Sequence, residues 1–499
     1  MSDFSPKGMD SQKTPDEKDL WKSINDYNND PEVLKLKHDE FLNGVTEKFD
    51  SEKLSGISRR KFLALLSASA ALTATACTDY HDKGEIVPYN KRPEEIFSGV
   101  ANYYASTCNG CEQACGILIK TREGRPIKVD GNPDHPINQG KICAKGQASI
   151  LGLYDPERLH EPLTMRKEIS WKNADEEIIT ALNDAQKDGK EIAIITGAVT
   201  SPTTKKVLED FAVKYPNTKI YSHTLVNDEQ RRSAWLECYG TNEYPSIKFD
   251  QANIFLALDA DFLGNEGSYI ENMRKYAAKR EVVGKTDFNR LYVAEGRLSA
   301  TGMMADYRLR ISPNQQLVFV YSLINELILT GSLINVDPAV SDKVANHSLA
   351  KYGHKEKISY LLKDLNDNRG KAIVYAGSTL SKEVHVAVNL LNEILGNTSL
   401  YDYSSTFKSS VKLSTREEIS QLVDSMKSEK VGVVIHFDSN PVYSLPEDYG
   451  YKSALKKVKT VVSLTEAENE SSAAGNYTLP INHPFESWGD ANVRGGVYS

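Results

Sequence analysis

The sequence lacks an excess of basic residues, an internal repeat and any low-complexity tract. Its 499 residues include 60 Lys and Arg against 68 Asp and Glu, so the formal net charge is -8. No basic stripe is available to meet phosphates, which excludes a nucleic-acid binder. The hydrophobic content of 40% and the charged content of 26% are typical of globular proteins. This length predicts about two to four domains.

Long hydrophobic runs are also scarce, and one run near the N-terminus stands out. It extends over 15 residues from Phe62 to Ala76 and is rich in Ala, Ser and Thr. As a helix it would span about 22 Å, which is short of the roughly 30 Å of a bilayer's hydrocarbon core. The run therefore fits the apolar part of an export signal better than a membrane span.

The residues around this run indicate export and lipidation. Arg59 and Arg60 in "SRRKFLA" resemble the twin-arginine signal, which exports folded proteins. "LTATAC" resembles the lipobox of bacterial lipoproteins, so Cys77 is the expected lipidated first residue of the mature chain; the alternative is an ordinary signal with a chance cysteine. We expect a lipid-anchored protein on the periplasmic face of the inner membrane. The preceding extension, residues 1–56, is either a set of short amphipathic helices or a disordered leader.

Cysteine is rare, and four of the six cysteines form one spaced group. The spacing C-x2-C-x3-C-x27-C sets Cys108, Cys111, Cys115 and Cys143 as candidate metal ligands. Short gaps let one loop supply three thiolates to an iron–sulfur cluster. Zinc also accepts four thiolates but usually binds two CxxC pairs. Disulfides, or no metal at all, are the third possibility.

The segment "CNGCEQACGILIKTREGRPIKVDGNPDHPINQGKICAKGQ" is similar to the N-terminal cluster module of the molybdopterin-dependent oxidoreductases. The resemblance implies a [4Fe-4S] cluster on the four cysteines. It also implies that Lys145, two residues after the fourth cysteine, lies between cluster and pterin. Within this segment we expect a hairpin whose turn is at Gly131, Asn132 and Pro133.

Downstream, buried strands alternate with helices, which predicts parallel sheets with helices on both faces. An example is a strand at 191–197, a helix capped by Ser201 with Pro202 in its first turn, and a strand at 218–222. The fold class is therefore α/β: a small β-rich iron–sulfur module, then doubly wound parallel-sheet domains of the molybdopterin oxidoreductase type. Ligands of such sheets bind beyond the carboxyl ends of the strands. The candidate lining segments are 196–201, 259–264, 295–302 and 438–440.

The expected domains follow the chain in order. They are the leader extension 1–56, the signal 57–77, the cluster module 95–165, an α/β domain 166–370 and an incomplete second α/β domain 371–499.

Two departures from the resemblance concern catalysis. Catalytic members of the family supply a Cys, selenocysteine, Ser or Asp to molybdenum, and we expect that position near 220–235. Only Ser222, His223 and Asp228 are candidates there. Cys238, beside Trp235 and Tyr239, is predicted to be a packed core thiol. Family members also continue well beyond the point where this sequence stops, so we expect it to be part of a longer chain.

Within the family, "NRLYVAEGRLSATGMMADYRL" and "NYTLPINHPFESWGDANVRGGVYS" resemble the iron–sulfur subunit of bacterial alternative complex III. That resemblance implies a respiratory complex with a quinol-binding membrane subunit and cytochrome c subunits, and a ferredoxin-like cluster domain in a missing C-terminal part. It also implies an electron-transfer role without substrate chemistry of its own, with molybdopterin guanine dinucleotide possible but not favoured. The alternatives are a catalytic molybdenum reductase of the polysulfide or thiosulfate type and a structural lipoprotein with a vestigial site.

Overall fold

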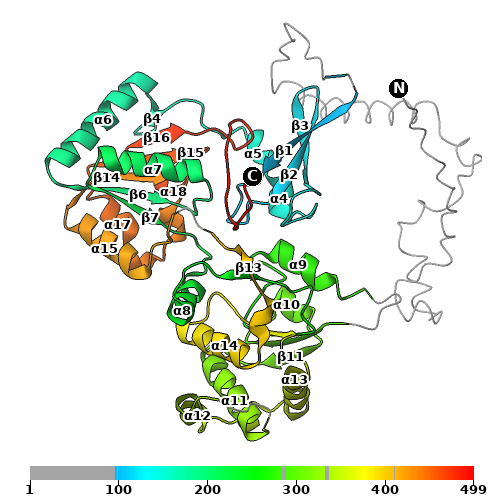
Figure 1. Cartoon of the computed structure of the whole chain (residues 1–499). Coiled ribbons are helices and arrows are strands. Elements are labelled where there is room, and N and C mark those ends of the chain that lie inside the picture. The colour runs from blue at the N-terminus through cyan, green and yellow to red at the C-terminus, as the bar shows by residue number, and fades with distance from the viewer. Residues whose placement is uncertain (1–95, 98, 282–287, 332–335, 409–410) are drawn as a thin grey trace, which may run out of the picture. The chain divides into compact units, whose positions relative to one another are not determined.

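The structure is a computed structural model that describes residues 96–97, 99–281, 288–331, 336–408 and 411–499 (Figure 1). These residues belong to the second of the chain's two units, Pro93–Ser499. The expected export signal with Arg59 and Arg60, the lipidation residue Cys77 and the leader extension lie outside the described residues.

The second unit begins with a three-stranded antiparallel sheet, which we call the cluster module together with the two short helices that follow it. Its elements are β1 (Ala101–Thr107), β2 (Gly116–Arg122), β3 (Arg125–Gly131), α4 (Ala144–Ala148) and α5 (Ile150–Leu153).

The hairpin of this module turns earlier than predicted. It turns at Glu123 and Gly124, whose φ angles are +52° and +81°, a conformation that glycine adopts without strain. At Gly131, where the turn was expected, the strand β3 ends and no return strand follows. A Cβ at Gly131 would lie 2.5 Å from the backbone of Gly140, so the glycine there serves a close backbone approach.

The largest sheet has seven strands in the order β5-β4-β16-β15-β14-β6-β7. Five strands run parallel, and β4 and β5 form an antiparallel edge. The strands are β4 (Leu163–Thr164), β5 (Lys167–Glu168), β6 (Glu191–Thr196), β7 (Thr218–Ser222), β14 (Val431–Phe437), β15 (Thr460–Thr465) and β16 (Tyr477–Pro480).

Helices cover both faces of this sheet, as the doubly wound prediction required. The apolar side chains of α6 (Trp171–Lys187) and α7 (Pro202–Lys214) pack on one face. Those of α15 (Arg416–Lys427) and α17 (Tyr451–Leu455) pack on the other. Ser201 caps α7 as predicted, because its Oγ accepts a hydrogen bond from the Thr204 amide at 2.9 Å.

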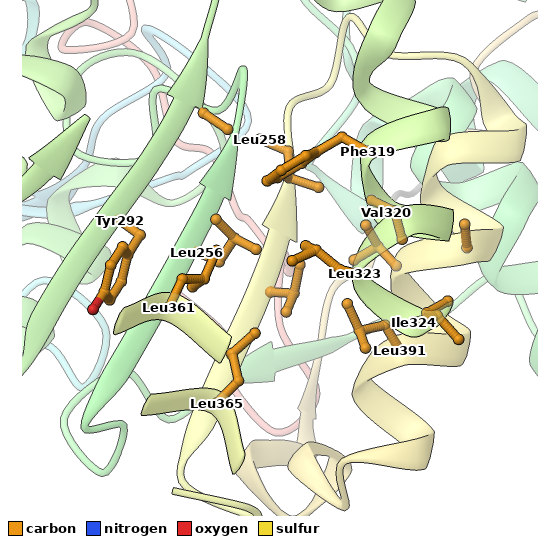
Figure 2. Packing of buried hydrophobic residues seen from close by; sticks show 14 of the residues in the cluster. Leu256, Leu258, Tyr292, Phe319, Val320, Leu323, Ile324, Leu361, Leu365 and Leu391 are labelled. Carbon is orange, nitrogen blue, oxygen red and sulfur yellow. The ribbon is translucent and has the colours of Figure 1, made fainter. Parts of the chain in front are cut away.

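A second, four-stranded sheet is entirely parallel, in the order β11-β10-β9-β12. Its strands are β9 (Ile254–Leu258), β10 (Arg290–Glu295), β11 (Tyr307–Arg310) and β12 (Ala372–Ala376). One face buries leucines of β9 against α11 (Gln316–Leu329), α13 (Lys355–Asp367) and α14 (Lys382–Ile394) (Figure 2). The other face is covered by α8 (Glu229–Tyr239) and α9 (Tyr269–Ala277).

Shorter elements complete the described part of the chain. Strands β8 (Pro245–Ile247) and β13 (Tyr401–Thr406) pair antiparallel. The remaining helices are α10 (Ala300–Met303), α12 (Pro338–Val344), α16 (Pro441–Ser444) and α18 (Glu470–Ala473), with 3-10 turns at Pro313–Gln315, Leu349–Tyr352, Asn397–Leu400 and Glu447–Tyr449.

The two sheets do not follow the predicted boundary between two α/β domains at residue 370. The chain leaves the seven-stranded sheet after β7, builds the whole four-stranded sheet including β12, and returns to the first sheet at β14. The predicted fold class is confirmed: two parallel α/β sheets follow a small β-rich module. No helix among the described residues combines the length and apolarity needed to cross a membrane.

Candidate metal centre and adjoining cavity

The first three candidate cysteines lie on one loop between β1 and β2. The amide of Cys108 donates to the carbonyl of Cys115 at 2.9 Å, which closes the loop at its base. Cys108 and Cys115 are buried, whereas Cys111 reaches solvent at the loop tip. Cys143 is the N-cap residue of α4, and its Sγ accepts a hydrogen bond from the Gly146 amide at 3.3 Å.

Cys108 lies against helix α4, whose N-cap residue is Cys143, because a Cβ on Gly146 of that helix would lie 3.7 Å from the Sγ of Cys108. Burial raises the pKa of Cys108, and burial together with the thiols of Cys111, Cys108 and Cys143 raises the pKa of Cys115 to about 12. Desolvation by the surrounding protein atoms also raises the pKa of Cys111. Such thiols ionise together only when a bound cation compensates their charge, and iron–sulfur clusters need four thiolates.

Glycines leave room around the sulfur atoms. A Cβ on Gly110 would lie 3.5 Å from the Sγ of Cys108, and a Cβ on Gly146 would lie 3.7 Å from the same sulfur. In the part of the chain that the structure describes, no group of three or more His, Cys, Asp or Glu side chains is arranged to hold a metal ion. The spacing of the four cysteines and the room that the two glycines leave beside Cys108 are compatible with a [4Fe-4S] cluster.

Lys145 lies at the same loop. Its Nζ donates to the carbonyl of Gly110 at 2.5 Å, and its positive charge opposes the rise in the pKa of Cys108 and Cys111. The structure therefore brings Lys145 together with the cysteine loop, although the two are 35 residues apart in sequence.

A cavity of about 900 Å³ adjoins the cysteine loop, and we call it the central cavity. Its wall includes Cys111 from the loop and residues that follow the carboxyl ends of parallel strands. Segment 196–201 after β6 lines it as the sequence predicted, and of the predicted segment 438–440 after β14 only Asp438 lines it. Ligands of parallel sheets bind at this edge.

The other two predicted segments, 259–264 and 295–302, do not line the central cavity. Their carboxylates are used inside the four-stranded sheet's own loops. Asp261 accepts hydrogen bonds from the amide and hydroxyl of Thr301, both at 2.9 Å. Glu295 is 1% exposed and accepts from the Nε of Arg308 at 2.6 Å. Residues 265–267, which follow the first of these segments, line the cavity instead, so that prediction was wrong by a few residues, whereas the prediction for 295–302 was wrong altogether.

None of the three candidate molybdenum ligands presents a free side-chain group to the cavity: Ser222 and Asp228 are hydrogen-bonded, and His223, whose Nε2 has no hydrogen-bond partner, lies outside the lining. Ser222 is fully buried and donates its hydroxyl to the carbonyl of Gly197 at 2.8 Å. His223 does not line the cavity, and burial lowers its pKa. Asp228 does line the cavity, but Arg231 donates to one of its oxygens at 2.7 Å and Tyr244 to the other at 2.8 Å.

Arg231 is the centre of a buried network that the sequence did not reveal. Besides Asp228, its guanidinium donates to Glu266 at 2.8 Å and to the carbonyl of Ala376 at 2.7 Å. The ring of Tyr375 lies 4.4 Å from the guanidinium carbon. Burial alone would raise the pKa of Asp228, but Arg231 and Tyr244 hold it below its ordinary value.

The described lining of the central cavity carries several carboxyl groups, two of which, those of Asp228 and Glu266, are paired with Arg231. This described lining includes Glu112, Asp228, Glu266 and Asp438 but no Lys, Arg or His. Burial and the charge of Asp228 raise the pKa of Glu112, which shows that the carboxylates oppose one another. The pyrophosphate of a pterin dinucleotide would find no cationic side chain in this described lining, so these residues do not fit that cofactor.

Cys238 is exposed, so its prediction as a packed core thiol was wrong. Trp235 and Tyr239 stack with ring centroids 4.0 Å apart, and Trp235 packs against Tyr401 in the core. These large rings fill the space on the buried face of α8. Cys238, in the last turn of the helix, is left on the surface, where Asn389 contacts its sulfur at 3.6 Å.

Comparisons with known proteins support the same reading of the cluster module. Residues 101–155 match the family model described as the molybdopterin oxidoreductase Fe4S4 domain. This match confirms the resemblance inferred from the cysteine spacing, and it supports a [4Fe-4S] cluster on this module.

Curated relatives extend the similarity beyond the module. The chain is 24% identical over 423 residues to the menaquinone reductase, molybdopterin-binding-like subunit of Nitratidesulfovibrio vulgaris, covering 79% of this chain and 60% of the relative. It is 24% identical over 270 residues to the arsenate respiratory reductase molybdopterin-containing subunit of a Shewanella species, covering 51% of this chain and 31% of the relative. The chain thus spans 60% or less of the length of these two relatives.

Among solved structures, acetylene hydratase from Pelobacter acetylenicus resembles the chain with a TM-score of 0.56. The sequence identity is 14%, and the match covers 76% of this chain and 63% of the other. This likeness concerns the fold, which is that of the molybdopterin oxidoreductases.

Proposed function

We propose that this chain is the molybdopterin-oxidoreductase-like part of an electron-transfer subunit in a quinol-oxidising respiratory complex of the alternative complex III type. The observation that carries the proposal is the combination of a complete cysteine quartet with a cavity unsuited to a pterin dinucleotide. A [4Fe-4S] cluster, when bound, supplies one-electron transfer. The chain's own residues hold and orient it.

The residues at the expected molybdenum position support the absence of substrate chemistry in this chain. Asp228 has both carboxylate oxygens engaged by Arg231 and Tyr244, so ligating a metal would break a buried ion pair. Removing one partner of such a pair costs about 3–5 kcal/mol. The carboxyl groups of Glu112 and Asp438, which do not pair with Arg231, also disfavour an anionic cofactor in the central cavity.

The similarity to a menaquinone reductase subunit supports a place in a multi-subunit respiratory complex. In this proposal the partners are a quinol-binding membrane subunit, cytochrome c subunits and a ferredoxin-like cluster domain. Twin-arginine export through Arg59 and Arg60, and lipid attachment at Cys77, would hold the protein on the periplasmic face of the inner membrane.

A second candidate is a catalytic molybdenum reductase. The observation that favours it is the size of the central cavity, about 900 Å³ directly beside the cysteine loop. The similarity to an arsenate respiratory reductase subunit points the same way. This candidate requires Asp228 to leave Arg231 and a counter-charge to enter the cavity.

Elemental analysis distinguishes the candidates. The full-length subunit is purified with its native complex, and iron, molybdenum and tungsten are measured together with pterin fluorescence. We expect iron without molybdenum, tungsten or pterin. Stoichiometric molybdenum or tungsten would overturn the proposal in favour of the reductase. The absence of all three metals would leave the structural lipoprotein as the surviving alternative.

A further inference from the structure

Arg494 is a buried cation in the C-terminal segment, which is red in Figure 1. Only 1% of its side chain is exposed, and its guanidinium carbon lies 3.7 Å from the centre of the Phe407 ring. It forms an ion pair with Glu271 of α9, and Glu271 is also paired with Lys275 at 2.7 Å. Buried charges of this kind are costly to maintain unless they are fully paired.

One branch of this guanidinium leads to the cysteine loop. Its Nη2 donates to the hydroxyl oxygen of Ser268 at 2.9 Å. The Ser268 hydroxyl in turn donates to the side-chain carbonyl of Gln113. Gln113 lies between Cys111 and Cys115, on the loop that carries three of the four candidate cluster ligands.

The direction of these hydrogen bonds follows from the groups themselves. An arginine can only donate, and a serine hydroxyl has a single proton to give. Because Arg494 occupies a lone pair of the Ser268 oxygen, the Ser268 proton is directed to the acceptor oxygen of Gln113. Each bond polarises the next, so the pair is stronger than two separate bonds.

Other residues of α9 contact the cluster module at nearby points. The Nη2 of Arg274 donates to the carbonyl of Ile137 at 3.3 Å. Tyr269 lies beside Cys143, and burial together with that contact raises the pKa of the Tyr269 hydroxyl. Helix α9 and its N-cap residue Ser268 therefore lie against the cluster module, and Arg494 determines how Ser268 is oriented there.

We infer that Arg494 is a positioning residue for the cluster: through Ser268 it fixes Gln113, and thereby the geometry of the loop that holds Cys111 and Cys115. The inference rests on the cluster included in the proposed function. It goes beyond that function because it assigns a role to a residue 379 positions after Cys115, in a segment that supplies no ligand.

We call the hydrogen-bonded series Arg494–Ser268–Gln113 the relay. The test uses two variants that interrupt it at different points. Ser268→Ala removes the hydroxyl, and Arg494→Gln removes the charge; Ser268→Thr keeps a hydroxyl and serves as the rescue variant. Arg308→Gln is the matched control, because Arg308 is also paired with a buried glutamate, Glu295, but contacts no part of the cluster module in the described structure.

Three quantities are measured on the full-length protein purified without oxygen. They are the rate of iron loss to a chelator, the electron paramagnetic resonance spectrum of the reduced cluster, and the thermal unfolding of the iron-free protein. We expect Ser268→Ala and Arg494→Gln to release iron on the order of tenfold faster and to alter the spectrum, since a hydrogen bond to a charged group is lost. Ser268→Thr and Arg308→Gln should match the wild type in both cluster measurements.

If the first two variants lower only the unfolding temperature and leave iron release and spectrum unchanged, the relay is merely structural and the inference is wrong. Ser268→Ala keeps the test decisive should Arg494→Gln fail to fold. A wild-type protein that binds no iron would instead show that the proposed cluster is wrong. That outcome differs from a cluster whose iron release and spectrum are unchanged in these variants.

Discussion

The guanidinium of Arg231 donates to the carboxylate of Asp228 at 2.7 Å, and their side chains are only 10% and 15% exposed. This ion pair stands in segment 220–235, where the resemblance to the family leads us to expect the molybdenum ligand of its catalytic members. Because Arg231 also binds Glu266 and the carbonyl of Ala376, it joins the start of α8 to the loop that follows β9 and to the end of β12. The position is thus used for structure in this chain.

Asp228→Asn should destabilise the protein strongly, because it leaves the charge of Arg231 with less compensation in a buried site. Removal of one partner from a buried pair costs about 3–5 kcal/mol. The matched control is Asp130→Asn, which breaks an exposed pair with Lys128 and should cost less than about 1 kcal/mol. Denaturant unfolding measures both, and equal losses would contradict the assignment.

Cys111→Ser should remove roughly four irons per chain, since a [4Fe-4S] cluster requires all four thiolates. Cys238→Ser is the matched control: Cys238 is also exposed but lies on α8. Iron is quantified per folded chain. An unchanged iron content in Cys111→Ser would show that these cysteines do not form one cluster.

Lys145→Gln should lower the reduction potential of the cluster. Reduction adds negative charge, and the Lys145 cation beside the cysteine loop stabilises that form, so its removal favours the oxidised cluster. The expected shift is on the order of tens of millivolts. Lys128→Gln, on β3, is the control. A redox titration measures the shift, and a rise in potential would refute the placement of Lys145.

His436 should make the stability of the fold depend on pH. Burial lowers its pKa to about 3, and its two ring nitrogens contact Ser463 at 3.0 Å and Tyr451 at 2.8 Å. In the unfolded chain the pKa is about 6.5. Between these values the unfolded state binds a proton that the native state does not. Stability is therefore fully present above pH 6.5 and falls as the pH drops below it, by about 1.4 kcal/mol per pH unit.

The measurement compares unfolding free energies of the wild type and of His436→Gln from pH 7.5 down to pH 5. Whatever its absolute stability, the variant should have a slope of unfolding free energy against pH that is smaller by the contribution of one proton, about 1.4 kcal/mol per pH unit. Identical slopes would mean that His436 does not titrate on unfolding.

The mature N-terminus should be a lipidated Cys77. Arg59→Lys combined with Arg60→Lys should block export and leave the full leader attached, and Cys77→Ala should leave the leader uncleaved at this site. Mass spectrometry of the membrane fraction identifies the terminus. An unmodified terminus at Cys77, or cleavage at another residue, would contradict the lipoprotein prediction.

Local patterns in the sequence were sufficient for much of the fold. The cysteine spacing predicted the cluster module, because one loop must supply three ligands at short intervals. Ser201 and Pro202 marked the start of α7, since capping and proline placement depend on adjacent residues only. Continuous apolar runs such as "EIAIIT" gave the buried parallel strands, and with them the edge at which segment 196–201 lines the cavity.

Tertiary structure alone decided what depends on residues far apart in the chain. Arg231 meets Glu266 across 35 residues, and Arg494 meets Ser268 across 226, so no local spacing reveals either contact. In sequence, the strands of the four-stranded sheet come between β7 and β14 of the seven-stranded sheet. Strands pair by packing and hydrogen bonding, and their order along the chain does not determine which of them pair. Cys238 is exposed because Trp235 and Tyr239 already fill the core beneath α8. The amino-acid type at a position determines the chemistry of its side chain. The partners and the burial of that side chain depend on which surfaces the folded chain brings together.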